Sequence, residues 1–359
     1  MSLLSRYLMR ELSLFILFAL IGLLGLYTFF DLIAELTDLG VGGYRLSDAL
    51  IFVALRAPAN AYELLPIAVL IGGIFGLSHL SGSSELTVIR ASGVSLKRLL
   101  LWLCLIGAFY GAITLLLGEY IAPAGKRMAN QHRLAATQSM LVGDFRSGVW
   151  IKDGRQIVNI AEMLPDLTVV HARIYEFGKT LTLERVIEGH NGRFQSKGNW
   201  TLQKATVTQF LPEHAGVALS KPAVFNWQTS ISPAMLAVLL VEPAQMSATS
   251  LLSYIDHLKR NKQKTSRYEL ALWGKLFYPL ACLSMVLIAL PFAQSQRRSG
   301  NAGVRVFIGI ACGLIFHFAN QIVVYLGDLY NWPPPIVVSI PTLLFLSAAA
   351  FMLWRQERR

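Results

Sequence analysis

Basic side chains gather at both ends of the polar stretch that runs from residue 126 to residue 269. They are Lys126, Arg127 and Arg133 at its N-terminal end, and Lys259, Arg260, Lys262, Lys264 and Arg267 at its C-terminal end. Guanidinium groups bind phosphate through paired hydrogen bonds, so a collar of this kind suits an anionic ligand that carries phosphate. A plain solvated rim has the same composition, and the sequence leaves both interpretations open.

A second set of candidate contact residues lies inside apolar segments. One segment ends with Leu26, Phe29 and Phe30, and another contains Phe316 and His317 followed by Phe318, Asn320 and Gln321. Polar residues in a helix of membrane length usually make helix–helix contacts. The alternative is that they line the wall of a cavity.

The motifs of catalysis and nucleotide binding are missing from this sequence. It contains no GxxxxGK[ST] phosphate loop and no GxSxG, HExxH or CxxC motif, and its seven histidines have no metal-ligand spacing. We therefore predict that the chain is not an enzyme, with no catalytic residues, no cofactor and no metal site.

One short polar segment has a pattern that suits docking of a separate motor protein. It reads Ser83-Ser84-Glu85-Leu86-Thr87-Val88-Ile89-Arg90-Ala91-Ser92-Gly93. A serine can cap a short helix, Glu85 suits the positive N-terminal end of that helix, and Gly93 ends it. Leu86 and Ile89 would form a small apolar stripe. A solvated loop helix explains the segment equally well.

Six segments are long and apolar enough to cross a bilayer, which takes about 20 helical residues. They are Leu12–Phe30, Leu46–Leu80, Leu99–Gly118, Leu276–Gln296, Val306–Gly327 and Trp332–Trp354. The second is unusual because Arg56 and Glu63 lie inside it on one helix face. Charges inside a membrane usually mark function. A shorter span from about Asn60 would instead place Arg56 beyond the bilayer and Glu63 at its edge.

Composition also indicates a membrane protein. Hydrophobic residues make up 54% of the chain, charged residues only 15%, and the mean hydropathy is +0.50, which excludes an ordinary soluble domain. The net charge of +11 is accompanied by no nucleic-acid-binding motif. Cys104, Cys282 and Cys312 all fall in predicted spans, so the polar stretch is expected to fold without disulfides.

The positions of the basic residues predict the orientation of the spans. With a cytoplasmic N-terminus, the short cytoplasmic segments contain eleven basic residues: Arg6, Arg10, Arg90, Lys97, Arg98, Arg297, Arg298, Arg305, Arg355, Arg358 and Arg359. The short outer loops contain only Arg45. Both termini are therefore predicted to be cytoplasmic, and the polar stretch is predicted to face the periplasm.

The polar stretch between the third and fourth spans has the pattern of β-strands. Asp153-Gly154 forms a hairpin signal between two apolar runs. Apolar and polar residues alternate along Thr168–Phe177, Thr180–Val186 and Asn199–Phe210, as in a sandwich, barrel or jelly roll. Leu251–Arg260 has the pattern of a short amphipathic helix.

Motifs along the whole chain resemble the LptF/LptG (YjgP/YjgQ) family of lipopolysaccharide export permeases. They are Arg6-Tyr7, Ser84-Glu85-Leu86, Ala91-Ser92-Gly93, Gly118-Glu119, Ala122-Pro123, the run Gly148-Val149-Trp150-Ile151-Lys152-Asp153-Gly154, Asn320-Gln321 and Pro334-Pro335. The run at 148–154 and the last two motifs are more similar to the LptG branch than to the LptF branch.

The resemblance implies a permease subunit of an ABC transporter that extracts lipopolysaccharide from the inner membrane and passes it to a periplasmic bridge toward the outer membrane. The implied partners are an LptF-like permease, two LptB-like ATPase subunits, and LptC-like and LptA-like bridge proteins. The implied domains are transmembrane helices in 1–125, with a coupling helix at 82–93, a periplasmic β-jellyroll with a return helix in 126–269, and transmembrane helices in 270–359.

The resemblance also assigns roles to residues. Glu85, Leu86, Ile89 and Arg90 would couple to the ATPase. Spans one and five would gate the lipid cavity, which points to Leu26, Phe29, Phe30, Phe316 and His317 as lipid contacts, with Arg133, Lys126 and Arg127 at the cavity mouth. This chain departs from one family tendency, because the outer end of span one is acidic at Asp31, Glu35 and Asp38. Electrostatic capture of phosphate by that helix is therefore not expected.

Other functions remain open from the sequence. Within the family, the chain could be an LptF-type partner subunit or export another lipid. A membrane-anchored periplasmic scaffold or sensor is a hypothesis of a different class, and it has no need of Glu85 or of polar residues that face a cavity.

Overall fold

The computed structural model describes residues 3–137, 149–163, 168–178, 182–196, 198–211, 216–233, 235–236, 243, 246–295 and 302–358. The chain divides into two compact units. The helical unit comprises Met1–Thr37, Val53–Met128 and Ser266–Arg359, and the sheet unit comprises Asp38–Phe52 and Ala129–Thr265. Gly148, Thr180, Arg297, Arg298 and Arg359 lie outside the described residues.

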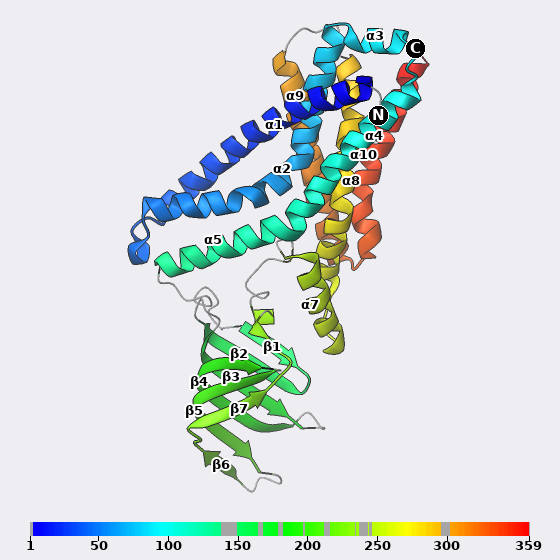
Figure 1. Cartoon of the computed structure of the whole chain (residues 1–359). Coiled ribbons are helices and arrows are strands. Elements are labelled where there is room, and N and C mark those ends of the chain that lie inside the picture. Colours follow the sequence, from blue (N-terminus) through cyan, green and yellow to red (C-terminus); the bar gives the residue numbers. More distant parts are fainter. Residues whose placement is uncertain are drawn as a thin grey trace. The chain divides into compact units, whose positions relative to one another are not determined.

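Among the residues that the structure describes, six helices are long and apolar enough to cross a membrane, as predicted. They are α1 (Leu3–Leu36), α2 (Leu46–Gly82), α4 (Leu96–Leu116), α8 (Ser266–Ser295), α9 (Ala302–Leu329) and α10 (Pro334–Glu357) (Figure 1). Most extend beyond the segments that hydropathy selects, because backbone hydrogen bonding continues where the side chains become polar. Arg56 and Glu63 both lie within the single helix α2.

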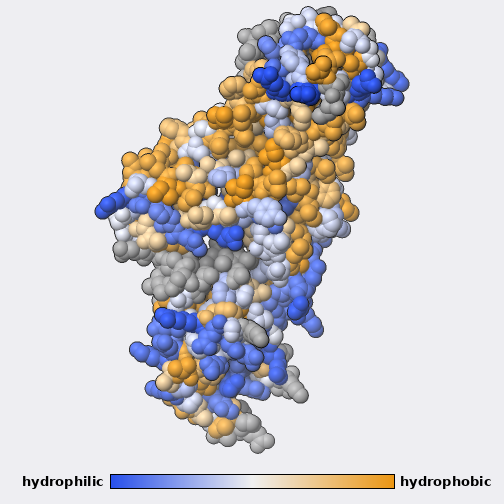
Figure 2. All heavy atoms as spheres, in the orientation of Figure 1, coloured by the Kyte–Doolittle hydropathy of each residue, from blue (hydrophilic) through white to orange (hydrophobic). Residues whose placement is uncertain are grey.

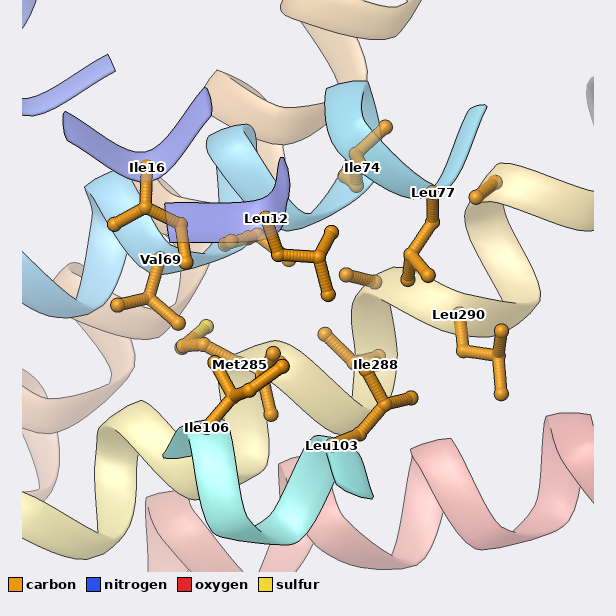
Figure 3. Close-up of a cluster of buried hydrophobic side chains, with 14 of the residues drawn as sticks. Leu12, Ile16, Val69, Ile74, Leu77, Leu103, Ile106, Met285, Ile288 and Leu290 are labelled. Atoms are coloured by element: carbon orange, nitrogen blue, oxygen red, sulfur yellow. The ribbon is translucent and has the colours of Figure 1, made fainter. Parts of the chain in front are cut away.

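The core of the helical unit is built from residues of α1, α2, α4 and α8. Leu12 and Ile16 of α1 are fully buried, and Figure 3 shows them beside residues of α2, α4 and α8. Gly72 and Gly76 of α2 lie against Ile16 and Leu12, so close that an added Cβ would overlap these residues. Small residues allow membrane helices to approach closely, and these two glycines thereby fix the position of α1.

The third span continues as an unbroken helical run past the residue at which we placed the start of the polar stretch. The helix α4 passes into a five-residue π-helix, η2 (Leu117–Ile121), and then into α5 (Ala122–Thr137). Hydropathy does not reveal α5 because polar side chains outnumber large apolar ones along it. Its alanine, arginine, methionine and glutamine residues nevertheless favour helix.

The strands form one antiparallel sheet, which confirms the predicted all-β insert. They are β1 (Val149–Asp153), β2 (Gln156–Met163), β3 (Val169–Phe177), β4 (Leu183–Ser196), β5 (Asn199–Phe210), β6 (Val217–Ser220) and β7 (Val224–Gln228). Their order is β1-β2-β3-β4-β5-β6. The strand β7 also pairs with β5, along residues 199–203, whereas β6 pairs along residues 207–210. Asp153 pairs with Gln156 across the predicted turn, where Gly154 has a φ of 60°.

One face of the sheet is apolar and the other is polar. The largest fully buried side chains on the apolar face belong to Trp200 and Trp227. Figure 2 shows hydrophilic residues over much of the visible surface of the strands and hydrophobic residues over the helices. The difference between the two faces of the sheet follows from the alternation of side chains along each strand.

The predicted amphipathic helix is α7 (Ala248–Arg260), which belongs to the sheet unit. The side chain of Ser247 caps it by accepting a hydrogen bond from the backbone N–H of Ser250 at 3.1 Å. Asn261, just past its end, accepts a hydrogen bond from the backbone N–H of Gly154 at 2.8 Å. The helix is thereby fixed to the β1–β2 hairpin.

Candidate functional site

The C-terminal half of α1 presents an apolar surface that the described part of the chain does not cover. In its most apolar stretch 11% of the residues are buried, compared with 78% in α2. Leu26, Phe29 and Phe30 are all exposed, and the two phenylalanine rings meet edge to face with centroids 5.8 Å apart. These candidate lipid contacts are therefore available to a lipid or to another membrane protein.

The helix α9 presents a second surface of this kind, with 17% of its apolar stretch buried. Of the two residues predicted there, His317 is exposed, whereas Phe316 is only 4% exposed and packs against Phe345 of α10 with ring centroids 5.1 Å apart. The exposed face instead carries Phe318 and Tyr325.

An ion pair joins α2 to α5, and a hydrogen bond joins α2 to the C-terminal part of α1, within the helical unit. Lys126 of α5 pairs with Glu63 of α2 at 3.2 Å, and the Lys126 side chain is only 12% exposed. The side-chain amide of Asn60 donates to Asp31 at 2.9 Å. The Nε of Arg127 donates to the carbonyl of Pro123 at 3.2 Å. Two of the predicted basic side chains thus already have partners in this chain.

The third predicted phosphate ligand, Arg133, pairs with an acidic residue of the segment that joins α1 to α2. Its guanidinium contacts the carboxylate of Asp38 and lies 5.4 Å from the centre of the Phe52 ring. Beside it, Nε2 of His132 lies 3.2 Å from a carboxylate oxygen of Asp48. One of the acidic residues that argue against phosphate capture, Asp38, is therefore the partner of Arg133, which argues for it.

The predicted coupling segment forms the short helix α3 (Glu85–Ala91). Leu86 and Ile89 are each 4% exposed and belong to the core of the helical unit, so they attach α3 to this chain. The carboxylate of Glu85 accepts a hydrogen bond from the hydroxyl of Tyr7 in α1 at 2.8 Å. The exposed side of α3 carries Val88, at 65%, and Arg90.

Comparison with known proteins decides the family. Residues 6–355 match the family described as lipopolysaccharide export system permease LptF/LptG. The chain belongs to this family. The lipopolysaccharide export system permease protein LptG of Escherichia coli K12 is 30% identical over 342 residues, which cover 95% of this chain and 94% of that protein. The LptG protein of Haemophilus influenzae is 26% identical over 355 residues, with 99% of each chain covered.

Membership of the LptF/LptG family confirms the resemblance drawn from the motifs, and it identifies the chain as a multi-pass permease subunit rather than an enzyme. Among the residues that the structure describes, no group of three or more His, Cys, Asp or Glu side chains is arranged to hold a metal ion. The roles of the individual site residues remain predictions.

The sequence of this LptF/LptG chain did not show which side chains of α9 and α3 point outward. Phe318 and Val88 are exposed, while their neighbours Phe316 and Leu86 are buried. For α9 the sequence held one signal, the glycines Gly309 and Gly313, which contact α2 in the structure. Phe316 follows Gly313 by three positions and so shares its face.

Proposed function

We propose that this chain is an LptG-type permease subunit that moves lipopolysaccharide out of the inner membrane together with an LptF-like partner. The names of the E. coli and H. influenzae relatives support the substrate and the LptG type. The observation that carries the proposal is the low burial of α1 and α9 compared with α2. These two helices offer aromatic surface for an occupant that this chain does not supply.

The geometry of α2 explains how two such surfaces arise in one chain. Gly72 and Gly76 hold α1 on one part of α2, and Ile71 and Ile67 of α2 contact Gly309 and Gly313 of α9. Both outer helices therefore share one central helix and direct their other faces away from it. A lipid with several acyl chains needs a wide apolar cavity, and facing surfaces of two permease subunits would form it.

The chain needs a separate source of energy, and α3 is the proposed attachment point. The sequence contains no phosphate loop, so we assign hydrolysis to two LptB-like ATPase subunits. Leu86 and Ile89 anchor α3 in the bundle, and Glu85 joins it to α1 through Tyr7. A force applied to the exposed Val88 and Arg90 would thus reach the first helix of the proposed gate.

The sheet unit is the proposed link to the periplasmic bridge. The distribution of basic residues supports a periplasmic position for this unit and a cytoplasmic position for both termini. LptC-like and LptA-like proteins would continue the path from there. Protease added to spheroplasts should then cut within 138–265 and spare the segment around Arg90, whereas protection of the sheet would reverse the orientation.

Site-specific photo-crosslinking in native membranes tests the lipid path. Phe30 on α1 is 60% exposed, Phe318 on α9 is 58% exposed, and Leu344 on α10 is also 58% exposed, which makes it a matched control. Crosslinkers at Phe30 and Phe318 should capture lipopolysaccharide or the partner permease, and one at Leu344 should capture only bulk phospholipid. Equal capture of lipopolysaccharide at all three positions would remove the support for a specific path.

A further inference from the structure

Two histidines that are 19 positions apart in the sequence meet on the polar face of the sheet. His171 of β3 and His190 of β4 are direct register partners. Their rings lie with centroids 4.7 Å apart at an angle of 67°, and their Nδ1 atoms are 3.4 Å apart. This proximity arises from the hairpin register.

The separation of the two nitrogens matches that of a bis-imidazole chelate. A metal–nitrogen bond to imidazole is about 2.0–2.1 Å long, so two nitrogens on a tetrahedral ion lie about 3.3–3.4 Å apart. A hydrogen bond to a ring N–H is normally about 2.9–3.0 Å long. The observed 3.4 Å is therefore long for a direct hydrogen bond and right for two ligands of one ion.

The backbone holds both histidines in place. β3 and β4 are interior strands, each paired on both sides. On β4, Gly189 and Gly192 lie so close to Leu202 that an added Cβ would be 2.7 Å and 2.8 Å from its side chain. Pre-positioned ligands lose little freedom on binding, which strengthens a chelate.

The backbone next to His190 departs from regular strand geometry. Asn191 has a φ of 49°, in the left-handed region, and the pairing of β4 with β5 shifts register on both sides of His190. Bulges of this kind commonly redirect a side chain near a functional site. His190 is exposed and His171 is half-buried, so an ion can reach the pair from solvent.

We propose that His171 and His190 form a binding site for a divalent transition-metal ion, with water completing its coordination. Zinc and copper fit best, because imidazole is a preferred ligand of both. The ion would join β3 to β4 on the face opposite the apolar core. This site is independent of the proposed lipid path, which lies on helices of the other unit.

Metal titration of the full chain, purified in detergent through a histidine-free tag, tests the site. Zn²⁺ affinity is measured by competition with a fluorescent chelator, and Cu²⁺ is examined by electron paramagnetic resonance. We expect one tight equivalent of Zn²⁺ and coupling of Cu²⁺ to two nitrogens. His171→Gln and His190→Gln should each weaken Zn²⁺ binding on the order of 100-fold, because the second ligand no longer binds intramolecularly.

Arg173→Gln is the matched control, because Arg173 pairs with Glu188 two positions along the same two strands. This substitution alters the neighbouring cross-strand pair and keeps both imidazoles, so the variant should bind Zn²⁺ as tightly as the wild type. The proposal is overturned if the His171→Gln, His190→Gln double variant binds Zn²⁺ as tightly as the wild type, or if Cu²⁺ couples to a single nitrogen. Unchanged circular dichroism of the variants ensures that a loss of binding reports on the ligands.

Discussion

The carboxylate of Asp38 forms an ion pair with the guanidinium of Arg133, which lies 95 positions later in the sequence. Asp38 follows α1 and Arg133 lies on α5, so the pair joins the end of the first helix to the end of the third helical run. Both side chains are 40% exposed. The carboxylate thus already holds part of the guanidinium that a bound phosphate would use, so the chain itself competes with its proposed ligand.

Asp38→Asn should strengthen lipopolysaccharide binding by the purified permease complex. An exposed ion pair contributes about 0.2–1 kcal/mol, so removal of the competing carboxylate should raise affinity by up to about fivefold. Asp48→Asn, which removes the neighbouring partner of His132, is the control and should change affinity less. Weaker binding by Asp38→Asn would show that the pair supports the site instead of competing with it.

Val88→Asp should weaken co-purification of the ATPase subunits with this chain. Val88 is 65% exposed on α3, and an unpaired charge in a buried interface costs about 2–5 kcal/mol. Leu252→Asp is a control of similar exposure on α7, at 56%. It should leave the ATPase bound. If neither substitution affects co-purification, α3 is not the docking surface.

The coupling between α3 and α1 predicts that Tyr7→Phe and Glu85→Gln act on the same contact. Tyr7→Phe removes the hydrogen bond between the Tyr7 hydroxyl and the Glu85 carboxylate, and Glu85→Gln weakens it by removing the negative charge of the acceptor. Each should reduce lipid-stimulated ATP hydrolysis, and the double variant should be no worse than the more severe single variant. Additive losses, measured with assembled complexes in nanodiscs, would show that the two residues act separately.

The stability of the sheet unit should fall as the pH drops below neutrality because of His257 on α7. Burial lowers the pKa of His257 below its usual 6.5, although the Asp153 carboxylate partly offsets this shift. The unfolded chain therefore takes up a proton at His257 before the folded chain does. Stability from this residue is complete above the unfolded-state pKa of about 6.5, and it is lost as the pH falls from there toward the lower pKa of the folded state. Proteolysis rates between pH 7.5 and pH 5.5 should rise less in His257→Gln than in the wild type.

Gly72→Ala should destabilise the helical unit, because the added Cβ would overlap the backbone of Ile16. Overpacking of a tight contact typically costs about 1–3 kcal/mol. Gly25→Ala is the control, since an added Cβ at Gly25 of α1 meets nothing within 4 Å. Thermal aggregation of the two variants in detergent should separate them, and similar curves would indicate that α1 can move away from α2.

Features encoded by neighbouring residues could be predicted from the sequence. The apolar spans, the Asp153-Gly154 turn and α7 each depend on a local pattern, and the structure confirms them. The inward face of α3 could not be predicted, because Leu86 and Ile89 have the pattern of any amphipathic stripe and tertiary packing decides what covers them. Likewise, the pairs Arg133–Asp38 and His171–His190 depend on packing and strand register between distant segments.

The π-helix η2 (Leu117–Ile121) sets the direction in which α5 faces. Each residue advances an α-helix by about 100°, so a turn widened by one residue rotates everything after it by that angle. Lys126, five residues past this turn, pairs with Glu63 in the rotated orientation. Deletion of one residue from the π-helix would turn the side chains of α5 to a different direction without changing the sequence of α5. A family member with the same α5 sequence but without the extra residue would therefore present different charges at the same surface.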